Sequence, residues 1–268
     1  MPTFRVTVRL GAIALAAALL LGPGPATAGT ATAGTSPVPA KGAIPAKGIL
    51  PPKHPARDVN PSPNFFAARS CQGGGDSATC NAIVLRAITH ARSVLEKIGG
   101  MSFSLAAYEK LTPVEQLFVT ANLERVERGL SPVVVLTRSL DKIAQAGAVA
   151  DQDPDLRKVP GTLPGGGHWV KLGGNWAGGF DNALGSDYGW MYLDKGSAWG
   201  HRDNIIGGYF TASSCRGARR EIAMGAGHVR TGEAFGDSET ELFAGICGPT
   251  PTDAVITWAK AKTLLHIK

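Results

Sequence analysis

The sequence predicts an α+β fold in which helices come first along the chain and strands come later. Between residues 83 and 150, apolar side chains recur about every 3.6 residues, which is the spacing of amphipathic helices. From residue 205 to 258, short apolar segments rich in β-branched and aromatic residues alternate with glycine-rich turns. Residues 151–182 are rich in glycine and proline and show neither period. This order favours an antiparallel sheet packed against helices.

One folded domain accounts for most of the chain. The 268 residues are 44% hydrophobic and 18% charged, which excludes a wholly disordered protein. Eight of the 18 prolines fall within residues 29–64, where a Pro-Ala-Lys-Gly unit begins at Pro39 and again at Pro45. Such a segment favours an extended, polyproline-like spacer over a packed core. We therefore expect residues 65–268 to form a single domain.

The first 28 residues have the pattern of an export signal. Arg5 and Arg9 precede the uncharged run Leu10–Leu21, and Ala26-Thr27-Ala28 provides a small-residue cleavage site. A membrane anchor is the alternative, but the run is shorter than the roughly 20 residues that span a bilayer, and Gly22-Pro23-Gly24-Pro25 ends it. We expect a secreted protein, extracellular or associated with the cell wall, with no transmembrane segment after signal removal.

The net charge does not point to nucleic acid. Removal of the signal lowers the formal charge by two, from +6 to +4, because it takes away two arginines and no acid. This charge is too small and too dispersed to predict a nucleic-acid partner. It is compatible with weak attraction to anionic wall polymers or lipid headgroups, and more simply with ordinary surface charge.

Three helices are predicted at the start of the domain. The second has the sharpest start, because Thr112 is followed by Pro113 and then by Glu115, which is a capping-box pattern. Glycines end the first two helices, at Gly99-Gly100 and Gly129. The predicted ranges are about 83–98, 113–128 and 139–150.

The rest of the domain is predicted to combine loop, short helices and strands. A short helix is expected near Leu184–Met191 and one helical turn near Gly200–Ile206. Residues 151–182 are expected to form a long loop that is functional or packed on itself. Four strands are expected at Ile205–Ala212, Glu221–Val229, Thr240–Cys247 and Ala254–Trp258, with turns such as Arg230-Thr231-Gly232 between them.

Four cysteines in an exported chain imply an oxidising compartment and two disulfide bonds. Three connectivities are possible, and we predict Cys71–Cys80 and Cys215–Cys247. Three consecutive glycines let the segment between the first pair bend back, and the second pair lies at the ends of predicted strands. By a chain-entropy argument the two bonds contribute ~2.7 and ~3.7 kcal/mol. Zinc on these sulfurs is disfavoured, because no C-x2-C or C-x4-C spacing exists.

The motifs of several enzyme classes are absent from the sequence. It contains no H-E-x-x-H zinc motif, no G-x-S-x-G nucleophile elbow and no Walker loop. Gly225-Ala226-Gly227 does not continue into G-x-G-x-x-G. Gly185-Ser186-Asp187-Tyr188-Gly189 is only superficially similar to an esterase elbow, since its serine stands in the second position. No nucleophile–base pair is therefore evident.

Three stretches carry the most specific pattern. In chain order they are Asn122–Leu130 on the second predicted helix, Tyr188-Gly189-Trp190-Met191-Tyr192, and Trp199-Gly200-His201-Arg202-Asp203-Asn204-Ile205-Ile206. Together they resemble the CAP superfamily, which includes cysteine-rich secretory proteins, antigen five and pathogenesis-related proteins. The resemblance covers roughly Leu111–Trp258 and is strongest to exported bacterial members. It implies an α-β-α sandwich with a central antiparallel sheet and a cleft on one side.

The resemblance also implies a cleft where two histidines and two acidic residues can hold zinc or calcium. His201 matches the signature histidine, and Asp194 is a candidate for one acidic position. Gly173-Gly174-Asn175-Trp176 stands where a Gly-Glu-Asn stretch is common, so Asn175 and Trp176 are further cleft candidates, and the third helix has no histidine. His168 lies in the long loop. Two ligands do not make a tight zinc site, so His201 and Asp194 leave metal binding uncertain.

Three functions remain open at this point. The first is an exported CAP-type protein that binds a lipid, glycan, metal or cell-wall component in a cleft near His201, without catalysis. The second is a secreted hydrolase of wall peptide or polysaccharide, in which His201 is the general base and Asp194 orients it. The third is a structural interaction module displayed by the spacer. A His201 that only fixes a turn inside the core would remove the first two.

Overall fold

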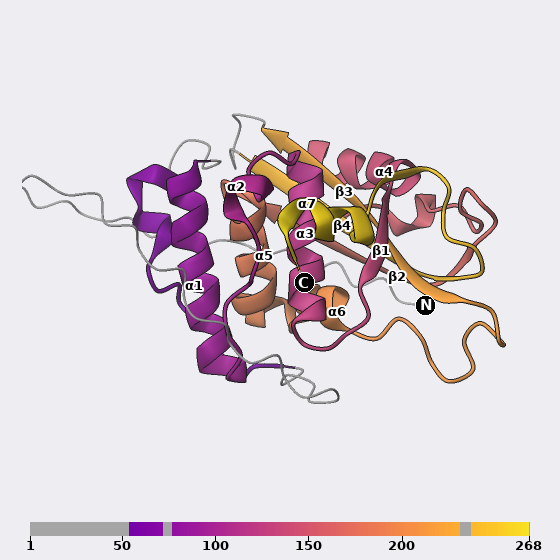
Figure 1. The fold of residues 1–268 in the computed structure, drawn as a ribbon, viewed down its shortest axis with the longest axis horizontal. Helices are drawn as coiled ribbons and strands as arrows, with labels where there is room; N and C mark the ends of the chain where they lie inside the picture. Colours follow the sequence, from indigo (N-terminus) through magenta and orange to yellow (C-terminus); the bar gives the residue numbers. More distant parts are fainter. Residues whose placement is uncertain (1–53, 72–76, 231–236, 268) are drawn as a thin grey trace, which may run out of the picture. The chain divides into compact units, whose positions relative to one another are not determined.

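A computed structural model describes residues 54–71, 77–230 and 237–267 of the chain (Figure 1). The expected signal peptide, residues 29–53 of the expected spacer and the turn after Arg230 lie outside these ranges. The helices are α1 (Ala78–Glu96), α2 (Leu105–Tyr108), α3 (Pro113–Val126), α4 (Arg138–Val149), α5 (Ala183–Tyr192), α6 (Gly200–Ile206) and α7 (Trp258–Leu265). The strands are β1 (Val133–Thr137), β2 (His168–Gly178), β3 (Arg220–Arg230), β4 (Asp237–Cys247) and β5 (Ala254–Thr257).

The strands of the described ranges form one five-stranded sheet in the order β2-β4-β3-β1-β5. The predicted α+β class is confirmed, with α1, α2 and α3 ahead of the first strand. Strand β4 pairs antiparallel with β2 and β3, and β1 pairs antiparallel with β5. However, β1 runs parallel to β3, so the sheet is mixed and the prediction of a fully antiparallel sheet is wrong at this pair. A parallel pair needs a crossover, which the long segment from α4 to α6 provides.

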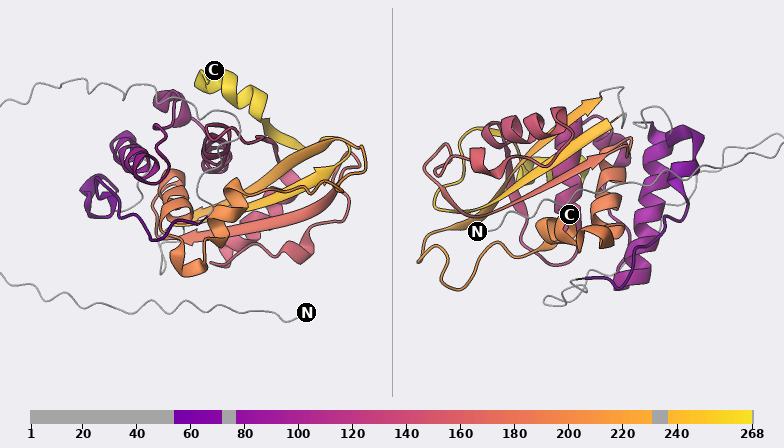
Figure 2. Two further views of the ribbon diagram at one scale, coloured as in Figure 1. Left: turned by 90° about the horizontal axis from the view of Figure 1, so that it is seen from below. Right: turned by 180° about the vertical axis from the view of Figure 1, so that it is seen from behind.

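Helices cover both faces of the sheet, which gives three layers (Figure 2). On one face α4 packs Leu140 and Ala144 against Leu242 of β4. On the other face α3, α5 and α7 enclose the larger core, which contains Phe118 and Tyr188. Because side chains alternate along a strand, β4 presents one set of residues to α4 and the other set to α3 and α5. The arrangement is the predicted α-β-α sandwich.

Helix α3 begins as predicted. The Thr112 hydroxyl accepts a hydrogen bond from the Glu115 backbone N–H (3.4 Å), and the Glu115 carboxylate accepts one from the Thr112 N–H (2.9 Å). Helix α1 begins at Ala78, earlier than expected, because Ser77 caps it through the Cys80 N–H. Within the described ranges, no helix combines the length and the apolar character needed to cross a bilayer.

The strand predictions are partly wrong. The predicted strand Ile205–Ala212 does not form, because Ile205 and Ile206 complete α6 and residues 207–212 are not in a strand. The sequence also fails to predict β1, which is short, and β2, which is rich in glycine. In β2 a Cβ at Gly173 would lie 2.5 Å from Oδ1 of Asn204, so a larger residue there would have to displace that side chain. The other three predicted strands are confirmed as β3, β4 and β5.

The packed part of the chain begins before residue 65. Val59 belongs to the main core, and its N–H donates to the carbonyl of Tyr192 (2.9 Å). The Tyr188 hydroxyl donates to the carbonyl of Val59 (2.8 Å), and Asp58 accepts from the Lys195 N–H (2.9 Å). The end of the expected spacer is therefore docked beside the C-terminal end of α5.

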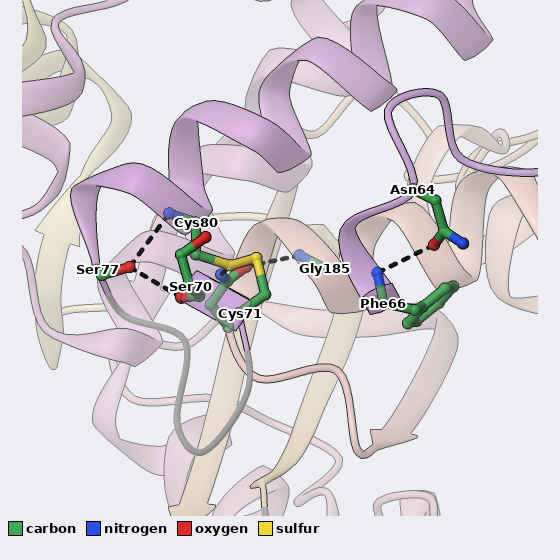
Figure 3. Close-up of a disulfide and its surroundings, with 8 residues drawn as sticks. Asn64, Phe66, Ser70, Cys71, Ser77, Cys80 and Gly185 are labelled. Atoms are coloured by element: carbon green, nitrogen blue, oxygen red, sulfur yellow. Dashed lines mark hydrogen bonds between the residues drawn. A yellow bond between two sulfur atoms is a disulfide. The ribbon is translucent and has the colours of Figure 1, made fainter. Parts of the chain in front are cut away.

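Both predicted disulfides are confirmed. Cys71 is bonded to Cys80 in the first turn of α1, with a Cα–Cα distance of 4.9 Å, and Ser77 bonds both the Cys80 N–H and the Ser70 carbonyl nearby (Figure 3). Cys215 is bonded to Cys247 at the end of β4, with a Cα–Cα distance of 5.1 Å. One reason for the second pairing was wrong, because Cys215 lies in a turn with φ of 67° rather than after a strand.

Candidate functional site

Residues 194–199 form a tight turn between α5 and α6. The Asp194 carbonyl accepts hydrogen bonds from the N–H groups of Ser197 (3.1 Å) and Trp199 (3.0 Å). Ala198 and Trp199 have left-handed backbone conformations, with φ of 53° and 64°. Such values are uncommon for residues with a side chain, so the surrounding contacts must hold them. The turn places the start of α6 beside the Asp194 side chain.

The buried Asp194 side chain is paired with the partly exposed side chain of His201. Asp194 Oδ1 lies 2.7 Å from His201 Nδ1, and Oδ2 accepts hydrogen bonds from the N–H groups of His201 (2.9 Å) and Arg202 (3.3 Å). The side chain of Asp194 is 3% exposed and that of His201 is 25% exposed. An ionised carboxylate only accepts hydrogen bonds, so Nδ1 carries a proton. Nε2 has no hydrogen-bond partner among the described residues.

Asp194 raises the pKa of His201. Burial of the ring alone would lower this pKa, but the hydrogen bond to Asp194 and the charges of Asp194 and Asp153 outweigh burial. Asp153 lies in the exposed loop after α4, where it accepts a hydrogen bond from the backbone N–H of Trp176. A larger fraction of His201 is therefore imidazolium at a given pH, and in that form Nε2 is a hydrogen-bond donor.

Asn175 of β2 connects the sheet to α6 through side-chain hydrogen bonds. Its side chain is fully buried, and its Nδ2 donates to the carbonyl of His201 (3.3 Å) and to a carboxylate oxygen of Glu241 (3.2 Å). Its Oδ1 accepts from Asn204 (2.9 Å). Trp176 is half-buried and donates from its indole nitrogen to the Ser238 hydroxyl (2.9 Å). Asn175 thus acts on His201 through the backbone of α6.

His168 lies far from the His201 site, whereas Asp153 acts on it. His168 is exposed at the first position of β2, and seven residues of extended strand put it about 23 Å from Asn175. Asp153, which the sequence does not single out, acts electrostatically on His201. In the sequence, Asp153 is marked only by its position in the long loop predicted at residues 151–182. No motif links it to His201, which lies 48 residues later.

The donor atoms around His201 do not fit a metal ion. Asp194 uses both carboxylate oxygens for hydrogen bonds to His201 and Arg202. His201 offers only Nε2, because Nδ1 faces Asp194. Across the described ranges, no three His, Cys, Asp or Glu side chains are arranged to hold a metal ion. Among the described residues, the zinc or calcium suggested by the resemblance therefore has no ligand set.

Replacing Asp194 with asparagine is expected to lower the pKa of His201. The amide keeps the size of the side chain but removes the negative charge that favours imidazolium. Because the folded-state pKa of His201 is raised, the pair stabilises the fold fully below about pH 6.5 and loses that contribution as pH rises through the folded-state value. An NMR titration of the histidine ring protons measures the shift. His90, exposed on α1, is the internal control, and an unchanged His201 pKa would contradict the role of Asp194.

No family model, curated protein or solved structure matches the chain.

Proposed function

We propose that this chain is an exported CAP-type protein that binds a glycan or lipid headgroup of the cell surface at His201, without catalysis. The observation that carries the proposal is the geometry of His201. Asp194 fixes its ring at Nδ1, yet a quarter of the side chain stays exposed. Export is supported by the signal-like residues 1–28 and by the two disulfides.

Binding is favoured over catalysis by the protonation of His201. A raised pKa enlarges the fraction of His201 in which Nε2 can donate to phosphate, carboxylate or sugar oxygens. A general base needs Nε2 unprotonated. In addition, all four cysteines are in disulfides, and no serine or threonine of the described ranges is hydrogen-bonded to Nε2. A nucleophile beside the base is thus not supplied by these residues.

Retention on cell-wall polysaccharide and on total-lipid extract tests the proposal. Purified protein starting at residue 29 is incubated with each material, and the bound fraction is measured. We expect the wild type to be retained on one of them, and His201→Ala to lose most of this retention. His90→Ala is the matched control, because His90 is an exposed histidine far along α1, and it should bind as the wild type does. Equal retention of His201→Ala and wild type would refute the proposal.

A secreted hydrolase is the second candidate, because His201 and Asp194 lie within hydrogen-bond distance. In this mechanism neutral His201 removes a proton from water through Nε2, while Asp194 holds the ring and stabilises the imidazolium that forms. Turnover of wall peptide or polysaccharide would then rise with pH through the His201 pKa. It would disappear in His201→Ala and survive in His90→Ala. Binding without any release of product excludes this candidate for the material tested.

A further inference from the structure

A groove of about 830 Å³ lies beside α6, at the opposite end from His201. Its lining comes from the C-terminal part of α6, the loop that follows it (Figure 1), the start of β3 and the segment before β1. His201 is not part of the lining, although Asp203 and Ile206 of the same helix are. This volume is in the range of pockets for small organic ligands. We call it the Arg125 groove, after one of its lining residues.

The described hydrogen-bond partners of Arg125 are all neutral backbone carbonyls. Its Nε donates to the carbonyl of Ser131 (2.8 Å), and its Nη1 donates to the carbonyls of Ile205 (2.5 Å) and Gly207 (3.4 Å). Arg125 is 3% exposed and lines the groove. Its Nη2 has no hydrogen-bond partner among the described residues. The side chain is therefore rigid, buried and left with one free donor nitrogen.

The other buried arginines of the described ranges all pair with carboxylates. Arg92 contacts Glu124 and Glu127, Arg128 contacts Glu124 and Glu96, and Arg202 contacts Glu96. No carboxylate of the described ranges lies within salt-bridge distance of Arg125. Burial accordingly lowers the pKa of Arg125 to about 10, offset only in part by Tyr209. A buried guanidinium without an acid is costly unless an anion pairs with it.

The rest of the groove combines apolar walls with positive charge. Leu130, Val134 and Phe210 provide apolar surface. Exposed Arg219 and Arg220 also line it. The two acids of the lining have other partners, since Asp203 lies 3.1 Å from His54 and Glu221 contacts Arg219 and the Thr250 hydroxyl. Among the described lining residues, the charged side chains without a partner of opposite charge are thus Arg125 and Arg220, and both are positive.

We propose that the Arg125 groove binds a small organic anion, whose carboxylate or phosphate group pairs with Arg125 while its apolar body lies along Leu130, Val134 and Phe210. A guanidinium is suited to this role because its N–H groups match the oxygens of carboxylates and phosphates. The occupant is a single soluble molecule, as the volume of the groove suggests. The proposal does not rest on His201, so the two sites can succeed or fail separately.

Calorimetric titration with octyl phosphate tests the ligand chemistry. We expect one molecule to bind per chain, with octanol and inorganic phosphate each at least tenfold weaker, because each lacks one half of the recognition. Octanol binding as tightly as octyl phosphate would overturn the role of Arg125. Binding to phosphatidic acid in phosphatidylcholine vesicles, with no binding of soluble octyl phosphate, would overturn the assignment of a soluble ligand.

Two variants locate the site. Arg125→Met removes the charge, but it also removes three bonds to backbone carbonyls and so threatens folding. Ser131→Trp avoids this problem, because Ser131 is exposed in the lining and contacts Arg125 only through its carbonyl. We expect Ser131→Trp to weaken octyl phosphate at least tenfold by filling the groove. Ser93→Trp, at an exposed serine on α1, should leave binding unchanged. Unchanged affinity in Ser131→Trp would refute the proposal, whatever the result for His201→Ala.

Discussion

Replacing Glu124 with glutamine is expected to lower the free energy of unfolding by about 3–5 kcal/mol. Glu124 is fully buried, and one of its oxygens contacts both Arg92 (3.1 Å) and Arg128. Its other oxygen accepts a hydrogen bond from the Tyr192 hydroxyl (2.7 Å). With Glu96 and Glu127, it balances the three arginines of this cluster, which includes Arg202. The glutamine leaves three buried arginines with two carboxylates, Glu96 and Glu127, so one buried positive charge is no longer balanced.

Urea denaturation at pH 7 measures this loss, and Glu127→Gln provides the comparison. Glu127 contacts Arg92 as well, but its side chain is 17% exposed, so water compensates part of the missing charge. We expect a clearly smaller loss for Glu127→Gln. Equal effects of the two substitutions would show that burial of Glu124 adds nothing to the strength of the cluster.

The same cluster predicts how stability depends on pH. Burial alone would raise the pKa of Glu124, but Arg128, Arg92 and the Tyr192 hydrogen bond lower it to about 2. Because the folded-state pKa is depressed, the contribution of Glu124 is complete above its ordinary value of 4.5. It is lost as pH falls from there towards 2. The stability difference between wild type and Glu124→Gln should shrink over that interval.

The Gly225→Ala substitution in β3 is expected to cost about 3 kcal/mol, at the upper end of the range for overpacking. Strand β3 lies directly under α4, and a Cβ at Gly225 would lie 2.5 Å from the backbone nitrogen of Asp141 and closer still to the carbonyl carbon of Leu140. Backbone atoms of a helix and a strand cannot move aside as a flexible side chain does. The helix must shift away from the sheet.

Thermal or urea unfolding measures this effect against Gly161→Ala. Gly161 has open space where its Cβ would be and no positive φ, so its substitution should change stability by less than about 0.5 kcal/mol. A Gly225→Ala protein as stable as Gly161→Ala would contradict the close contact between α4 and β3.

Local signals in the sequence predict much of the fold. Apolar periodicity and the Thr112 capping box locate α3, because these signals depend on residues within a few positions of one another. The run of valines in β1 also favours a strand, but its five residues are too few to show an alternating pattern. Strand β2 has no such signal, since the contact of Gly173 with Asn204 depends on the folded chain. Its glycines are typical of a loop, so the sequence predicts a loop there.

The candidate site is less predictable than the fold for the same reason. His201 and Asp194 are seven residues apart, and their contact depends on left-handed conformations at Ala198 and Trp199 that neither residue type favours. Burial of Glu124 and Arg125 in α3 also contradicts an amphipathic pattern, which places charges outside. Both are inside because charged, hydroxyl or carbonyl groups surround them, and several of these, such as Arg92 and Ile205, are remote in sequence.

The most direct test of the central claim is the pH dependence of retention on the cell-surface material that the protein binds. Wild type and Asp194→Asn are compared between about pH 5 and pH 8, where a histidine near its ordinary pKa changes charge. If protonated His201 donates to the ligand, retention of the wild type falls as pH rises through the His201 pKa. The fall then occurs at lower pH in Asp194→Asn. Retention that is independent of pH and equal in the two proteins would contradict binding through His201.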